Sequence, residues 1–104
     1  MVHVSSTEVV HLRHSDFDIY IGRKTRGGQH HYGNPFKIGE DGTREEVIEA
    51  YRLWLEGTAY QDVEPERRAW ILTNLYKLKG KRLGCYCSPL PCHGDVLKEI
   101  VDGA

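Results

Sequence analysis

The chain has 104 residues and a formal net charge of −1, with 39% hydrophobic and 28% charged residues. This size and composition predict a single globular domain over residues 1–104 rather than a disordered chain. The near-neutral charge does not favour extensive binding of nucleic acid, although it leaves room for a local basic patch. No apolar run approaches a membrane span, and the first residues lack signal-peptide features. We therefore expect a cytoplasmic protein without membrane association; the sequence does not define its oligomeric state.

Two strands and a loop are predicted in the first third of the chain. Residues 8–13 are rich in β-branched side chains and show little helical periodicity, and residues 19–23 place Ile19 and Ile21 on one face. Residues 24–33 form a loop rich in Gly, Arg and His. The following Asn34-Pro35 is expected to be extended, because the residue before proline avoids the helical region.

Two helices are predicted in the middle of the chain. The first is expected to begin after Thr43, which has Glu46 at the spacing of a capping box, and to end at Gly57. Its apolar stripe is formed by Val47, Ile48, Tyr51, Trp54 and Leu55. The second is expected to begin near Pro65, to end before Gly80 and to carry its apolar residues on one side. That side would consist of Ala69, Leu72, Leu75 and Tyr76.

The last part of the chain predicts a strand over residues 81–87, a proline-containing connection and a helix over residues 94–101. The apolar face of this helix would consist of Val96, Leu97, Ile100 and Val101. The order of the elements predicts an α/β fold, with a short mixed sheet of three to four strands and about three packing helices. Cys87 then ends a strand and Cys92-His93 begins a helix, so both border the crevice where α/β proteins usually bind ligands. The free N–H groups of such a helix start favour an anion or a thiolate.

A metal site is the first interpretation of the cysteines, of which the chain has three. An odd number in a cytosolic setting favours cysteines that are free, metal-bound or reactive. Cys85 and Cys87 would point to the same face of a strand, and with Cys92 and His93 they make a Cys₃His set suited to zinc. Against zinc, the spacing is not a common one and adjacent side chains diverge. Cys85 could instead be a small buried core residue.

A metal-free site in the same crevice is the second interpretation. Cys92 at a helix start would have a lowered pKa, and His93 could donate to an anion or exchange a proton. Asp95 is either a second catalytic group or a first-turn acid that interacts with the helix dipole. Gly94 between His93 and Asp95 would permit close approach of a ligand, which favours the catalytic interpretation of His93 and Asp95.

A second candidate cluster follows the strand at residues 19–23. Gly22 and Arg23 could hold a phosphate or carboxylate, since arginine binds both in a bidentate manner. Asn34 offers a donor and an acceptor for a base edge or a ribose hydroxyl. Together with Cys87 and Cys92, these residues are the predicted ligand-binding set.

Four segments of the chain together resemble a known family. They are Tyr20–Arg23, Gly33–Phe36, Asp41–Glu46 and Leu83–Leu97, the last containing a C-x-C-x-P-x-P-C-H-G-D motif. They are similar to domain-of-unknown-function family 4326, small proteins of bacteria, archaea and many bacteriophages. The resemblance covers nearly the whole chain and implies an intracellular phage or prokaryotic protein. It implies no particular activity.

The leading hypothesis for function is a protein that binds an anionic small molecule of the nucleotide or nucleoside type or acts on it as an enzyme. Its basis is the pair of polar loops at strand ends. The alternative is a non-catalytic module, stabilised by zinc, that binds protein or nucleic acid as a phage accessory or inhibitor protein. ATP hydrolysis and dinucleotide chemistry are disfavoured because the chain lacks the glycine patterns of those folds.

Overall fold

The computed structural model describes residues 7–22, 31–87 and 90–103. Their elements, in chain order, are β1 (Glu8–His11), β2 (Ile19–Tyr20), α1 (Arg44–Glu56), α2 (Pro65–Asn74), the 3₁₀ helix η1 (Leu75–Leu78), β3 (Arg82–Cys85) and α3 (His93–Gly103). This arrangement confirms the predicted α/β class with one small sheet and packing helices. Within these ranges, no helix combines the length and the apolar character that crossing a membrane requires.

The sheet has the strand order β1-β3-β2, so β3 lies in the centre. Both neighbours run parallel to β3, and Leu83 pairs with Val9 on one side and with Ile19 on the other. Among the described strands the sheet is thus entirely parallel, and the predicted mixed sheet is wrong. The reason lies in the connections. Residues 12–18 and the long helical segment before β3 each bring the chain back to the edge where the previous strand began, so that the next strand runs in the same direction. The strands are also shorter than predicted at both β1 and β2.

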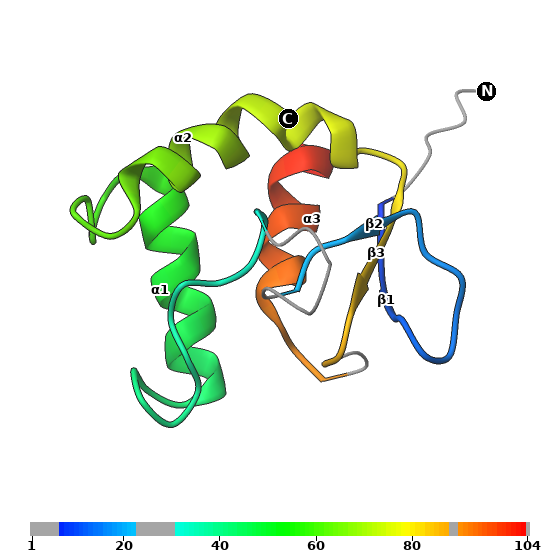
Figure 1. Ribbon diagram of the computed structural model, residues 1–104, viewed down its shortest axis with the longest axis horizontal. Coiled ribbons are helices and arrows are strands. Elements are labelled where there is room, and N and C mark those ends of the chain that lie inside the picture. The colour runs from blue at the N-terminus through cyan, green and yellow to red at the C-terminus, as the bar shows by residue number, and fades with distance from the viewer. Residues whose placement is uncertain (1–6, 23–30, 88–89, 104) are drawn as a thin grey trace.

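The two faces of β3 have different surroundings. Leu83 and Cys85 are buried, with 0% and 1% of their surface exposed, on the face covered by helices. The intervening Gly84 faces the other way, where a Cβ atom would lie 2.7 Å from the Phe17 ring. A side chain at position 84 would therefore displace the connection between β1 and β2. Figure 1 shows the helices together on one side of the sheet and this connection on the other.

Helix α1 forms as the sequence predicts. The Glu46 N–H donates to Thr43 Oγ1 at 3.2 Å, and the Thr43 N–H donates to Glu46 Oε1 at 2.8 Å, which completes the capping box. Gly57 ends the helix with φ 83°, a left-handed conformation that glycine adopts without strain. The predicted apolar stripe is confirmed, since its members are buried or packed against the core.

The buried side of α2 differs from the predicted one. Ile71 and Leu78 are fully buried, whereas Leu72 and Tyr76 are 39% and 73% exposed. The stripe based on Leu72 is therefore wrong, and the helix changes to 3₁₀ geometry after Asn74. A polar residue in the buried row explains the error: Asn74 donates from Nδ2 to the Trp70 carbonyl, and its own carbonyl accepts from a tyrosine hydroxyl. Once bonded in this way, the amide can lie on the core-facing side.

Helix α3 packs on the sheet through the predicted face, in which Val96 and Leu97 are fully buried. Its last turn is tied to the start of β1. The Thr7 hydroxyl is buried, donates to Asp102 Oδ1 at 2.7 Å and accepts from the Gly80 N–H at 2.9 Å. The hydrogen bond from Thr7 lowers the pKa of Asp102. One side chain therefore joins the beginning of β1, the turn before β3 and the end of α3.

The corrected face of α2 gives a matched pair of substitutions. Ile71→Ala should reduce the free energy of unfolding by roughly 2–5 kcal/mol, because it removes a fully buried side chain. The adjacent Leu72→Ala should cost under about 1 kcal/mol, because that side chain is largely in water. Urea unfolding midpoints of both variants check this. A larger loss for Leu72→Ala would contradict the observed helix face.

Candidate functional site

A cavity of about 240 Å³ lies at the carboxyl edge of β2 and β3, between the starts of α1 and α3. Its polar and sulfur-containing lining is formed by Asn34, Arg44, Cys85, Cys87, Cys92 and His93, with Gly22 at its edge. The remaining lining is apolar or aromatic and is formed by Tyr20, Ile38, Val47, Ile48, Tyr86 and Pro91. The crevice expected from the sequence is therefore present, and it brings together residues from both predicted clusters.

Three thiols meet at the inner wall of the cavity. Cys85 and Cys92 are buried, and their sulfur atoms lie 3.5 Å apart. Cys87 follows the end of β3, is half-buried and lines the same cavity within hydrogen-bonding reach of both other thiols. Cys85 and Cys87 reach the same side because alternate residues of an extended chain share a face. All three cysteines are free.

The thiols differ in their tendency to ionise. Hydrogen bonds from Cys85 and Cys92, together with the neighbouring Arg44 guanidinium, lower the pKa of Cys87 well below its ordinary value. The pKa of Cys92 is raised, because its hydrogen bonds to Cys85 and Cys87 and its burial favour the neutral thiol. The predicted lowering at Cys92 is therefore wrong. The surroundings therefore favour the thiolate form at Cys87 over Cys92.

Cys92 caps α3. Its sulfur accepts from the Gly94 N–H at 3.3 Å, and its own N–H donates to Asp95 Oδ2 at 3.0 Å. The bond to Asp95 is the backward half of a capping box, while the Cys92 sulfur accepts from the second helical N–H, as N-cap side chains also do. These bonds use N–H groups that the sequence analysis assigned to an anion. Asp95 is not among the residues that line the cavity, and its observed role is to cap the helix.

His93 lines the cavity but its ring is directed toward β2. The Nε2–H donates to the Ile21 carbonyl at 2.5 Å, and the ring packs edge-on against Tyr51 with centroids 5.1 Å apart. The four residues predicted to bind zinc are thus only partly assembled, with three sulfurs together and the imidazole turned away. In the part of the chain that the structure describes, no group of three or more His, Cys, Asp or Glu is placed to hold a metal ion. Zinc binding and the catalytic role of His93 stay predictions.

Asn34 also lines the cavity, and both ends of its amide hold the backbone. Nδ2 donates to the Val47 carbonyl at 3.0 Å, and Oδ1 accepts from the Phe36 N–H at 2.9 Å. Asn34 therefore fastens the segment before α1 to that helix, and recognition of a base by Asn34 stays a prediction. Gly22 lies where a Cβ would overlap the Tyr20 ring. The predicted ligand residue Arg23 lies outside the described residues.

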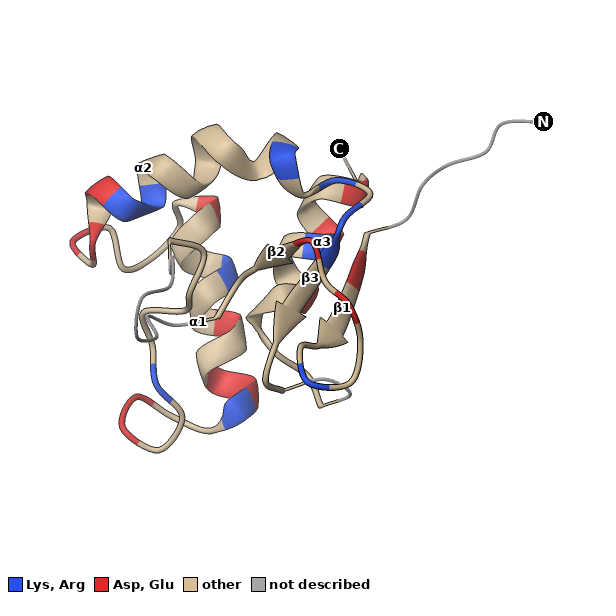
Figure 2. Ribbon diagram, turned by 45° about the vertical axis from the view of Figure 1, so that its right-hand side comes forward, with Lys and Arg blue, Asp and Glu red and all other residues tan. Residues whose placement is uncertain are grey.

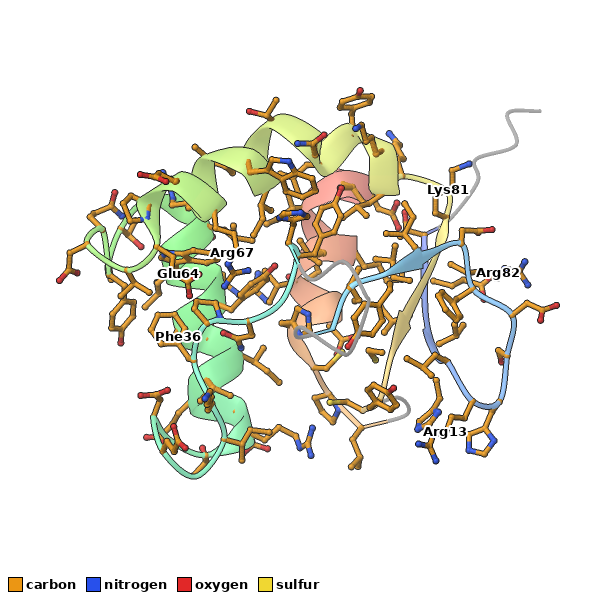
Figure 3. The ribbon with its side chains drawn as sticks, viewed as in Figure 1. Arg13, Phe36, Glu64, Arg67, Lys81 and Arg82 are labelled. Atoms are coloured by element: carbon orange, nitrogen blue, oxygen red, sulfur yellow. The ribbon has the colours of Figure 1, made fainter. Side chains whose placement is uncertain are left out.

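Arg67 supports the segment that carries Asn34. Its Nη1 donates to the carbonyls of His31 at 2.8 Å and Gly33 at 2.5 Å, and its Nε pairs with Glu64 at 2.8 Å. Figure 3 shows Arg67 and Glu64 close together beside α1. This arginine fixes the approach of the chain to the cavity from the α2 side.

Arg44 is the functional candidate that the sequence analysis missed. Its Nη1 donates to the Pro91 carbonyl at 3.0 Å, and its guanidinium lies next to Cys87. Arg44 precedes Val47 and Ile48 by three and four residues, so the apolar stripe of α1 already placed it on the face toward the core. Figure 2 shows basic and acidic residues adjacent at the start of this helix. Glu46 beside it is occupied in the capping box. Among the described residues that line the cavity, Arg44 is the one Lys or Arg side chain.

These features define a class: a small parallel α/β protein with a three-thiol cluster and one arginine in a cavity at the carboxyl edge of its sheet. The chain belongs to the family described as Domain of unknown function (DUF4326), whose profile matches residues 4–103. It is also similar to the uncharacterized 12.4 kDa protein in the nrdA-td intergenic region of Enterobacteria phage T4. The two are 36% identical over 97 residues, which cover 90% of this chain and 76% of the phage protein. No solved structure matches the chain.

The capping role of Asp95 can be tested separately from ligand binding. Asp95→Ala should reduce stability by about 0.5–2 kcal/mol, because the Cys92 N–H loses its acceptor. Asp95→Asn keeps an oxygen acceptor and should lose less. Denaturant midpoints of the two variants measure the difference. Equal stability of Asp95→Ala and the unmodified protein would exclude the capping role.

Proposed function

We propose that this protein binds a small nucleotide- or nucleoside-type ligand with an anionic group in the cavity at the carboxyl edge of its sheet. The observation that carries the proposal is that Arg44 lines the same cavity as two tyrosines, Tyr20 and Tyr86. A cation and aromatic rings around one cavity suit a ligand that is charged at one end and planar at the other.

The charged end would bind to Arg44. One of its five N–H groups donates to the Pro91 carbonyl, and the guanidinium also neighbours the Cys87 thiol. The remaining donors on the planar guanidinium can hold two oxygens of a phosphate or carboxylate at once. The helix start contributes less than the sequence suggested, because Cys92 and Asp95 already bind its N–H groups.

The planar end would lie against the aromatic and aliphatic lining. The rings of Tyr20 and Tyr86 are edge-to-face with centroids 6.4 Å apart, and Tyr86 is half exposed. Ile38 and Ile48 provide apolar contact surface to the same cavity. Its volume of about 240 Å³ is close to the lower limit of small-molecule sites, about 300 Å³. A mononucleotide or nucleoside therefore fits this proposal better than a dinucleotide.

A ligand screen with a matched pair of variants tests the proposal. A library of nucleotides and nucleosides is screened by thermal shift under reducing conditions, and each hit is titrated by calorimetry. Arg44→Gln should weaken a phosphorylated hit about ten- to hundredfold, since a charge-assisted contact contributes roughly 1.5–3 kcal/mol. Arg52→Gln is the control, because Arg52 lies on the same helix but pairs with Glu99 outside the cavity. The proposal fails if no compound stabilises the protein or if both variants bind equally.

A second candidate function, the zinc-stabilised binding module, is supported by the Cys85 and Cys92 sulfurs 3.5 Å apart with Cys87 in the same cavity lining. A zinc ion would need these thiols as thiolates and a fourth ligand, for which His93 could offer Nδ1 while its Nε2–H donates to the Ile21 carbonyl.

Metal analysis of the purified protein decides this candidate. A zinc module predicts about one equivalent of zinc per chain and a lower melting temperature after chelation. A metal-free protein whose melting temperature is unaffected by a chelator would exclude it.

A further inference from the structure

The three-thiol cluster has an accessible member and a buried pair, which neither ligand binding nor capping requires. Cys87 faces the cavity and is half-buried, while Cys85 and Cys92 lie behind it with their sulfurs 3.5 Å apart. Cys87 is within hydrogen-bonding reach of both. A cysteine that serves only as a small apolar core residue would not need another sulfur next to it, as Cys85 and Cys92 have. An exposed thiol backed by others in contact is the arrangement that thiol–disulfide exchange uses.

We propose that Cys87 and Cys92 form a dithiol site that exchanges with small anionic disulfides, with Cys87 as the attacking thiol and Cys92 as the resolving thiol. The carboxylates of such a disulfide would be attracted by Arg44, which lines the cavity beside Cys87. This inference does not depend on nucleotide binding, although both use the same arginine.

The exchange proceeds in two displacements. Cys87 gives up its proton to water, and its sulfur attacks one sulfur of the disulfide RSSR. The S–S bond of RSSR breaks, a mixed disulfide forms on Cys87, and the departing RS⁻ takes up a proton. The Cys92 sulfur, after losing its own proton, then attacks the Cys87 sulfur and releases the second RS⁻, which is protonated. The protein loses two electrons and two protons, and RSSR gains both to give two RSH.

Cys92 is assigned as the resolving thiol because of where the two buried cysteines lie. Cys85 is held in the central strand, where it pairs with His11 and its carbonyl accepts from the Leu12 N–H at 3.0 Å. A bridge between Cys85 and Cys87 would close a ring across a single intervening residue and distort the end of β3, because disulfides need Cβ atoms about 3.5–4.5 Å apart. Cys92 lies outside β3, directly before α3, and lines the same cavity as Cys87.

The experiment uses the full chain, treated with a chelator, reduced, and then exposed to oxidised glutathione. Intact mass and alkylation of the remaining thiols are followed over time. The wild-type protein should lose two hydrogens, keep one alkylatable thiol at Cys85 and give a Cys87–Cys92 peptide pair. Cys92→Ser should stop at a glutathione adduct on Cys87, and it keeps a capping oxygen for α3. Cys87→Ser should not react on this timescale, whereas Cys85→Ser should behave like the wild type.

Two further controls make the assignment specific. Circular dichroism shows whether each variant is folded, and Arg44→Gln should slow reaction with oxidised glutathione more than with the uncharged bis(2-hydroxyethyl) disulfide. Three alkylatable thiols in the oxidant-treated wild type would overturn the proposal. So would a disulfide that forms in Cys92→Ser but is lost in Cys85→Ser. Because the ligand screen is run under reducing conditions, failure of either proposal can be recognised independently of the other.

Discussion

Parallel pairing of β3 with both of its neighbours is the constraint on which the site depends. Parallel strands end at the same edge of a sheet, so Gly22 after β2 and Cys87 after β3 come close although they are far apart in the sequence. The chain continues from β3 directly into α3, which places Cys92 and His93 at that edge as well. If β2 ran antiparallel, Gly22 would lie at the opposite edge and the cavity would lose one wall.

Several polar residues at or near the cavity hold its walls together. Asn34 binds backbone groups at both ends of its amide, His93 binds the Ile21 carbonyl, and Asp95 caps α3. Buried polar groups need such partners, because leaving them unpaired costs about 1–3 kcal/mol each. These three residues, which the sequence analysis selected as candidate site residues, therefore have structural roles at the site. The thiols, Arg44 and the tyrosines share the cavity lining with Asn34 and His93.

Arg44 connects the two proposals. It lies at the beginning of α1, is fixed by the Pro91 carbonyl and neighbours Cys87. A bound nucleotide phosphate and the carboxylate of a small disulfide would both be attracted to this guanidinium. The two ligands would therefore compete for the cavity, because about 240 Å³ does not accommodate both. Oxidation of Cys87 would also change the wall against which a nucleotide lies.

Features that depend on neighbours along the chain could be predicted without a structure. The capping box at Thr43 and Glu46, the stripe of α1, the face of α3 and the shared face of Cys85 and Cys87 all follow from local spacing, and the structure confirms them. The crevice could also be located, because a strand followed by a proline connection and a helix fixes where one edge of the sheet lies.

Three features could be found only from the folded chain: the direction of the strands, the buried side of α2 and the orientation of the His93 ring. Each depends on atoms from distant parts of the chain: the returning connection at residues 12–18, the tyrosine that pairs with Asn74, and the Ile21 carbonyl. Local periodicity cannot reveal a hydrogen bond that spans 72 residues, as the one between His93 and Ile21 does. For the same reason the role of Arg44 became visible only when α1 was packed against the connection that contains Pro91.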